Sequence, residues 1–177
     1  MTREELIALA KQTAAAHHLD PALVCAVCEQ ESSWNPWALR YEPAFFAKYV
    51  APLLTNGKVS ATEAYARAFS WGLMQVMGQV AREHGSTSAH GSTLAHRDPE
   101  RSRMGHHPER ESRDGCSHTF LSELCDPAKG LEVGCSVLAH KLAAAEGNVA
   151  KALLLWNGGA NPNYADEVLA RTHKYRE

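Results

Sequence analysis

The chain has 177 residues, with 18 basic and 20 acidic side chains and a formal net charge of -2. This length suits one domain with a single apolar core, and the balanced charge is not typical of a nucleic-acid-binding protein. No stretch approaches the roughly 20 continuous apolar residues that a bilayer-spanning helix needs. We therefore expect one domain over residues 1–177, most simply a monomer, with no nucleic acid partner and no membrane span.

The chain begins with charged, helix-like residues, and no apolar run followed by a small-residue cleavage site is visible. We therefore expect synthesis in a cytoplasm without a signal peptide. The five cysteines cannot all pair within one chain. Cys25 and Cys28 form a C-x-x-C, which can indicate metal or redox chemistry, but they stand in an apolar helical sequence that favours simple packing.

Helix start signals recur along the chain. Thr2 and Glu5 form a capping box, and Asp20-Pro21 starts a second helix that should end near Glu31. Further helices are expected from Ser60 to Phe69, from about Gly72 to Glu83, after Asp126-Pro127, from Val149 to Trp156 and from Pro162. No stretch alternates between polar and apolar residues over a strand-like length, so the expected fold class is all-α.

The segment 85–118 departs from this pattern because it is polar and lacks helical periodicity. It contains five histidines, namely His90, His96, His106, His107 and His118. Their spacing is irregular and includes no helical H-x-x-x-H pair, so we expect a polar, solvated insertion without a metal site.

Glu31 lies at the predicted end of an apolar helix and close to Trp34. Partial burial raises the pKa of a carboxyl group and keeps it protonated near neutral pH. A glycosidase needs such a group to protonate the leaving oxygen of the bond that it cleaves. The alternative is a solvated helix end without a catalytic role.

A second motif runs from Ser70 to Gly78. Gly72, at the expected start of a helix, would allow a ligand or another backbone to approach closely. Gln75 and Met77 could then offer an amide and a thioether to a common cleft. The alternative is that the methionines of this motif are only core residues.

Three motifs in order resemble the superfamily of goose-type lysozymes and lytic transglycosylases (SLT domain), including its phage-type members. They are Glu31-Ser32-Ser33-Trp34-Asn35-Pro36, then Gly72-Leu73-Met74-Gln75-Val76-Met77, then Trp156-Asn157-Gly158-Gly159 with the trailing Tyr164. The resemblance implies a lysozyme-like helical domain, here with a His-rich inserted loop. It also implies cleavage of the β-1,4 bond between N-acetylmuramic acid and N-acetylglucosamine in peptidoglycan glycan strands, without a cofactor.

The family's roles carry over residue by residue. Glu31 matches the catalytic acid, and the expected substrate-binding residues are Gln75, Met77, Tyr41, Ser70, Trp156, Asn157 and Tyr164. Trp156 departs from the pattern because the family usually has tyrosine there, and an indole can only donate a hydrogen bond. Arg40-Tyr41-Glu42-Pro43 resembles an R-Y-E-P element of phage-type relatives.

The reaction type stays open at this point. A lytic transglycosylase uses one carboxyl group and forms a 1,6-anhydromuramoyl product, whereas a hydrolytic muramidase normally needs a second carboxylate, for which Glu42 is the candidate. We favour the transglycosylase. An idle wall-binding or assembly module and a zinc-dependent hydrolase that uses the histidines are the alternatives from other classes.

A cell-wall substrate raises the question of how the protein reaches it. A phage endolysin, a tail-associated enzyme or export by a non-classical route would each suit a chain without a visible signal peptide. We also hypothesise that the segment 85–118 gains positive charge near about pH 6 and contacts anionic wall polymers.

Overall fold

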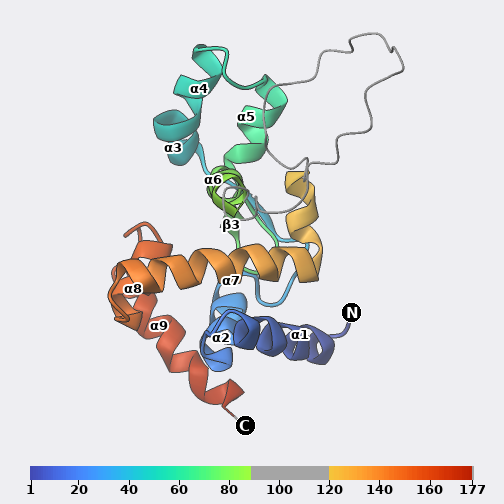
Figure 1. Cartoon of the computed structure of the whole chain (residues 1–177), viewed down its shortest axis with the longest axis vertical. Helices are drawn as coiled ribbons and strands as arrows, with labels where there is room; N and C mark the ends of the chain where they lie inside the picture. The colour runs from blue at the N-terminus through green and yellow to red at the C-terminus, as the bar shows by residue number, and fades with distance from the viewer. Residues whose placement is uncertain (89–119, 177) are drawn as a thin grey trace, which may run out of the picture.

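The structure is a computed structural model that describes residues 1–88 and 120–176 (Figure 1). Within these residues the chain is mainly helical, with one small antiparallel sheet. The expected helical fold class is confirmed, and the sheet is an addition to it. Most of the segment 85–118, with its five histidines, lies outside the described residues, as does Cys116.

The first two helices begin at the residues expected from their caps. Helix α1 spans Arg3–Ala16, and both hydrogen bonds of its capping box are present: Thr2 N–H donates to Glu5 and Glu5 N–H donates to the Thr2 hydroxyl. Helix α2 spans Pro21–Ser32 and is capped by Asp20. Its residues from Ala22 to Cys28 are all buried, so α2 is the central helix of the core.

Cys25 and Cys28 are fully buried free thiols within α2. Burial raises the pKa of Cys25 to about 11. The thiol is therefore protonated at neutral pH, and the expectation that the C-x-x-C packs as small apolar side chains is confirmed.

Three further helices pack around α2. Helix α7 (Pro127–Ala144) crosses the centre of the molecule, and α8 (Val149–Trp156) and α9 (Tyr164–Arg171) fold back from its end (Figure 1). The short 3-10 helix η3 (Thr172–Tyr175) follows and contacts α2. We call the assembly of α1, α2, α7, α8, α9 and η3 the lower body.

Helix α9 begins later than the expected start at Pro162. The side chain of Asn161 accepts a hydrogen bond from the backbone N–H of Asn163 at 2.9 Å, which holds this stretch in a turn. The first helical residue is therefore Tyr164.

A smaller lobe stands on the other side of α7 (Figure 1). This upper lobe consists of α3 (Pro43–Phe45), the π-helical turn η1 (Phe46–Val50), α4 (Ala51–Thr55) and α5 (Ala61–Arg67). It has its own apolar cluster around Val50, Ala64 and Ala68. Helix α5 ends before the expected Phe69 because that residue enters a strand.

The sheet joins the upper lobe to the lower body. Its strands are β1 (Leu39–Tyr41), β2 (Phe69–Trp71) and β3 (Val76–Met77), paired antiparallel in that order. Helix α6 (Gly78–Ser88) follows, and the 3-10 helix η2 (Leu121–Cys125) precedes α7.

The prediction that a helix begins at about Gly72 is therefore wrong, because α6 begins at Gly78. Gly72 and Gln75 both have positive φ, +69° and +49°, and they form a turn between β2 and β3. A Cβ atom on Gly72 would lie 2.1 Å from the carbonyl oxygen of Leu124, so glycine is needed for close backbone approach rather than for a helix start.

No helix in the described ranges 1–88 and 120–176 is long and apolar enough to cross a membrane.

Candidate active site

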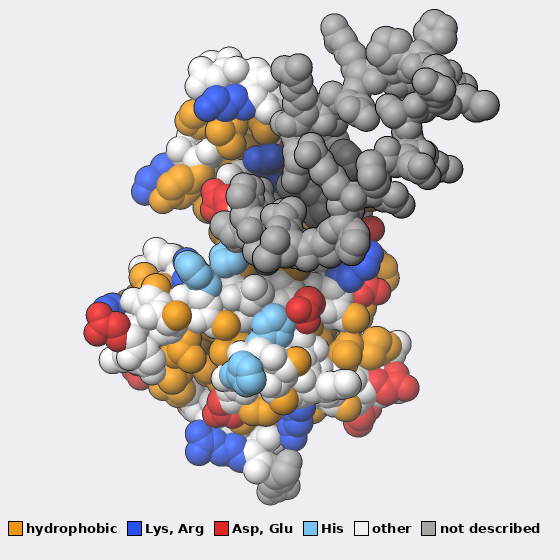
Figure 2. Space-filling view, in the orientation of Figure 1, with side chains coloured by type: hydrophobic (Ala, Val, Ile, Leu, Met, Phe, Trp, Pro, Cys, Tyr) orange, Lys and Arg blue, Asp and Glu red, His pale blue; other side chains and the backbone are white. Residues whose placement is uncertain are grey.

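A cleft of about 780 Å³ lies between the upper lobe and the lower body. In Figure 2 the outline of the molecule is indented between these two parts. The upper wall includes Arg40, Glu42, Phe45, Lys48 and Tyr49; the lower wall includes Gln30, Glu31, Val137, Lys141, Leu155, Trp156, Asn157 and Tyr164; Ser70, Gln75, Val76, Met77 and Val80 lie between.

Glu31 reaches this cleft from the last turn of α2. One of its carboxyl oxygens, Oε1, accepts two hydrogen bonds from the lower wall. The hydroxyl of Tyr164 donates to it at 2.5 Å, and the indole Nε1 of Trp156 donates at 3.1 Å. Helices α2, α8 and α9 therefore meet at this one oxygen atom.

The other oxygen, Oε2, has no hydrogen bond to a residue of the described part of the chain. Since Glu31 lines the cleft, Oε2 is the carboxyl oxygen that is left to exchange a proton with a bound molecule.

The pKa of the Glu31 carboxyl is raised above its ordinary value, mainly because burial penalises the charged form. The hydrogen bonds from Tyr164 and Trp156 and the positive charge of Arg40 lower this pKa, and the negative charge of Glu42 raises it. Burial outweighs the stabilising contacts, so the protonated acid persists to higher pH than in an exposed glutamate.

Tyr164 is a neutral hydrogen-bond donor to this carboxyl group. It lies at the start of α9 and is almost completely buried. Burial, followed by the negative charge of Glu31, strongly raises its pKa, so the phenol keeps its proton. Trp156, at the position where the resemblance implies a tyrosine, supplies the second donor. An indole cannot accept a hydrogen bond, but none is needed here because Glu31 Oε1 is the acceptor.

Glu42, the possible second carboxylate, lines the same cleft from the upper side. It accepts a hydrogen bond from Arg40 Nε and forms an ion pair with that side chain. The sequence thus singled out two carboxyl groups that do share a cleft, but one is half-buried and the other is paired with a cation.

Ser70 and Gln75 line the cleft, but their polar atoms are used within the protein. The Gln75 amide donates to the carbonyl oxygens of Ala38 and Gly72, both at 3.0 Å, and the Ser70 hydroxyl donates to Gln75 Oε1 at 2.8 Å. Both side chains are nearly fully buried. They brace the sheet and the turn before β3, and thereby fix the surface that Met77 presents.

The other candidate residues divide between the cleft and the core. Met77 and Asn157 line the cleft. Tyr41 is outside its lining and packs against other aromatic rings, among them Phe69 of β2, whose ring centre lies 5.3 Å away. Trp34, another aromatic near the motif, is buried and donates a hydrogen bond to the Tyr175 hydroxyl.

Several cleft residues were not selected from the sequence. Phe45 and Tyr49 form a ring pair with centres 4.8 Å apart, and the Lys48 amine lies 4.8 Å above the Tyr49 ring. The aromatic-rich composition of residues 40–49 was the available signal. Gln30 was also missed: its amide donates to Glu167, and its buried Oε1 has no partner in the described part of the chain.

A second network anchors the chain just after Glu31. Ser33 and Trp34 have positive φ, and Trp34 Nε1 donates to the Tyr175 hydroxyl, which in turn donates to Glu29 at 2.9 Å. The Lys174 amine also donates to Glu29. Helix η3 therefore holds the end of α2, and with it Glu31, in a fixed position.

The sequence was found to match a known protein family. The family described as transglycosylase SLT domain matches residues 8–105, which is more than half of the chain. The chain belongs to this family. Its members cleave glycosidic bonds in peptidoglycan, so the protein is a glycosidic-bond-cleaving enzyme with a cell-wall substrate.

The matched range includes Glu31, Gln75 and Met77 but ends before Trp156 and Tyr164. The two donors to Glu31 therefore come from a part of the chain that the family match does not cover, and only the folded structure brings them to the carboxyl group. The comparisons found no matching curated protein and no matching solved structure.

Proposed function

We propose that this enzyme is a lytic transglycosylase that uses Glu31 as both acid and base. It would cleave the β-1,4 bond between N-acetylmuramic acid and N-acetylglucosamine and form a 1,6-anhydromuramoyl end. The observation that carries the proposal is the state of Glu31: a half-buried carboxyl group with a raised pKa, two donors on Oε1 and no hydrogen bond on Oε2 from the described residues.

In the first step, the protonated Oε2 of Glu31 donates its proton to the glycosidic oxygen. The bond from that oxygen to C1 of the muramoyl sugar breaks, the N-acetylglucosamine side leaves as an alcohol, and positive charge develops at C1. The carboxylate that remains is stabilised by the hydrogen bonds from Tyr164 and Trp156, which are stronger to a charged acceptor.

In the second step, the Glu31 carboxylate takes the proton of the muramoyl C6 hydroxyl. The C6 oxygen forms a bond to C1, which closes the 1,6-anhydro ring. No water is consumed, and Glu31 is protonated again for the next turnover. One carboxyl group is sufficient for this sequence because the same atom gives and then receives a proton.

The surroundings of Glu42 favour this route over hydrolysis. A hydrolytic muramidase needs a second carboxylate that activates water or attacks C1. Glu42 is engaged in an ion pair with Arg40, whose guanidinium competes with a water molecule for the Glu42 Oε1 atom. Its proposed role is electrostatic, since its charge raises the pKa of Glu31.

The remaining cleft residues suit a sugar chain. The Phe45 and Tyr49 rings offer apolar faces on which a pyranose ring can stack, and Met77 and Asn157 offer an apolar and a polar contact on the other side. Gln75, Ser70 and Tyr41 would act indirectly by holding these surfaces in place.

Mass spectrometry of the muropeptides released from purified peptidoglycan tests the reaction type. We expect anhydro ends, which are lighter than reducing ends by one water. Reducing ends would instead identify a hydrolytic muramidase and would give Glu42 the role of second carboxylate. No released product from any wall preparation would favour a non-catalytic binding or assembly module.

A further inference from the structure

The cleft contains more positive than negative charge when the proposed acid is protonated. Arg40, Lys48 and Lys141 line it together with Glu31 and Glu42. Glu42 pairs with Arg40, and Glu31 carries no charge in its acid form. The positive charges of Lys48 and Lys141 are therefore not balanced by the cleft's own carboxyl groups and can interact with a bound molecule.

These two lysines belong to different parts of the protein. Lys48 is exposed on η1 in the upper lobe, and its amine lies against the face of Tyr49. Lys141 is half-buried on α7 in the lower body. Neither forms an ion pair with a carboxylate in the ranges 1–88 and 120–176.

The sugar backbone of peptidoglycan offers little for such charges to bind. N-acetylglucosamine is neutral, and the lactyl carboxyl of N-acetylmuramic acid is consumed in an amide bond wherever a peptide stem is attached. The stem itself carries free carboxylates, and about four extended residues reach about 13 Å from the sugar. A stem can therefore meet lysines on both walls of a cleft that holds its muramoyl unit.

We infer that Lys48 and Lys141 form a cationic subsite for the carboxylates of the peptide stem, so that the enzyme prefers stem-bearing glycan strands. This inference rests on the proposed function, because it assumes that a muramoyl unit is bound beside Glu31. Charge complementarity of this kind acts mainly on selectivity and on the rate of association.

The test compares three substrates with the same sugar chain. The first bears peptide stems with free carboxylates, the second bears the same stems with their carboxylates amidated, and the third is a denuded strand whose lactyl carboxylates are free. The measured quantity is kcat/KM for each substrate, from the release of product ends, with wild type and the double variant Lys48→Gln/Lys141→Gln.

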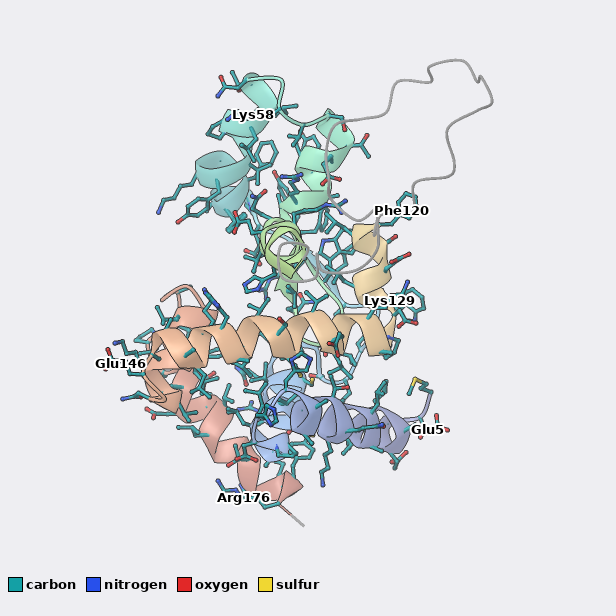
Figure 3. All side chains as sticks on the ribbon, in the orientation of Figure 1. Glu5, Lys58, Phe120, Lys129, Glu146 and Arg176 are labelled. Atoms are coloured by element: carbon teal, nitrogen blue, oxygen red, sulfur yellow. The ribbon has the colours of Figure 1, made fainter. Side chains whose placement is uncertain are left out.

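A double variant Lys58→Gln/Lys151→Gln is the matched control. It removes the same charge from one exposed lysine of the upper lobe and one of the lower body, and neither residue lines the cleft. Figure 3 shows Lys58 at the far tip of the upper lobe. Thermal unfolding of both double variants checks that each is folded.

For wild type we expect kcat/KM on free stems to exceed that on amidated stems about fivefold at low salt, and the excess to shrink as salt screens the charges. In Lys48→Gln/Lys141→Gln the ratio should approach one, and in the control it should equal the wild-type ratio. A wild-type ratio near one, or a ratio that the cleft variant leaves unchanged, would overturn the inference.

Two other results have separate meanings. If the cleft variant loses activity on denuded strands but not on free stems, the lysines bind the lactyl carboxylate, and the assignment to the stem is wrong. If Glu31→Gln cleaves all three substrates at the wild-type rate, the proposed function fails, and the inference falls with it.

Discussion

The hydroxyl of Tyr164 lies 2.5 Å from Oε1 of Glu31, although 133 residues separate the two along the chain. The contact joins the end of α2 to the start of α9 inside the cleft. Because the phenol donates a hydrogen bond, it stabilises the carboxylate form of Glu31 and opposes the rise in the Glu31 pKa that burial causes.

Tyr164→Phe should therefore slow the reaction and change its pH dependence. Loss of a hydrogen bond to a charged group should lower kcat about tenfold to a hundredfold. Since the lost bond lowers the pKa of Glu31, that pKa should rise. The acid form is required, so activity falls as pH rises through this pKa, and the alkaline limb of the pH profile should move to higher pH. Tyr65→Phe, outside the cleft, is the control and should leave the profile unchanged.

Trp156 provides a test of donor chemistry at the second contact. Trp156→Phe removes the indole N–H that donates to Glu31 and should lower kcat about tenfold, again with an alkaline limb at higher pH. Trp156→Tyr restores a side-chain donor and should recover most of the activity. Equal activity losses in the two variants would mean that the indole acts through packing alone.

Glu42→Gln separates the two reaction types. In a transglycosylase the variant should keep kcat within about threefold of wild type and still release anhydro ends, because Glu42 forms only a partly exposed ion pair. The negative charge of Glu42 raises the pKa of Glu31, so its removal should move the alkaline limb to lower pH. General base catalysis contributes on the order of 10²–10⁴ to a rate. A loss of about a hundredfold or more would therefore indicate that Glu42 acts as the second carboxylate of a hydrolase.

Gly72→Ala tests the turn that places Gln75 and Met77. The added Cβ would meet the carbonyl oxygen of Leu124 at 2.1 Å, and the residue has φ +69°. The clash and the strained backbone should together reduce the free energy of unfolding by about 3 kcal/mol or more. Gly57→Ala is a matched control with φ +65° and nothing within 4 Å, and it should cost only about 1–2 kcal/mol of backbone strain. Equal midpoints in urea would contradict this account.

The sequence predicted most helices because their start signals are local. Thr2, Asp20, Asp126 and Asn148 each cap a helix with a side-chain hydrogen bond, and such bonds depend only on residues two or three positions away. The burial of the first part of α2 could likewise be predicted, since the residues from Ala22 to Cys28 are all apolar.

The sheet and the turn at Gly72 could not be predicted in this way. Strands of two or three residues are too short to show an alternating pattern, and the apolar residues Leu73, Met74 and Val76 suit a helix equally well. What decides the conformation is the approach of Leu124, which is distant in sequence.

The candidate site shows the same division. Glu31 could be selected because the motif and the apolar helix before it are local signals. The assignment of Gln75 as a direct ligand could not anticipate that Ala38 and Gly72 occupy its amide. Lys48, Tyr49 and Lys141 line the cleft only because the upper lobe packs opposite α7 in the folded protein. Local sequence patterns do not predict how these two parts face each other.

Cleavage of purified peptidoglycan by Glu31→Gln is the most direct test of the central claim, which is that one carboxyl group performs the chemistry. The amide can still accept the hydrogen bonds from Tyr164 and Trp156, so the fold should be retained, but it cannot donate and recover the proton. Turnover should fall about a thousandfold or more, while Glu146→Gln, an exposed residue outside the cleft, should match wild type. Removal of a general acid–base residue should lower the rate on the order of 10²–10⁴-fold. A Glu31→Gln enzyme that keeps more than about a tenth of the wild-type rate would therefore contradict the account.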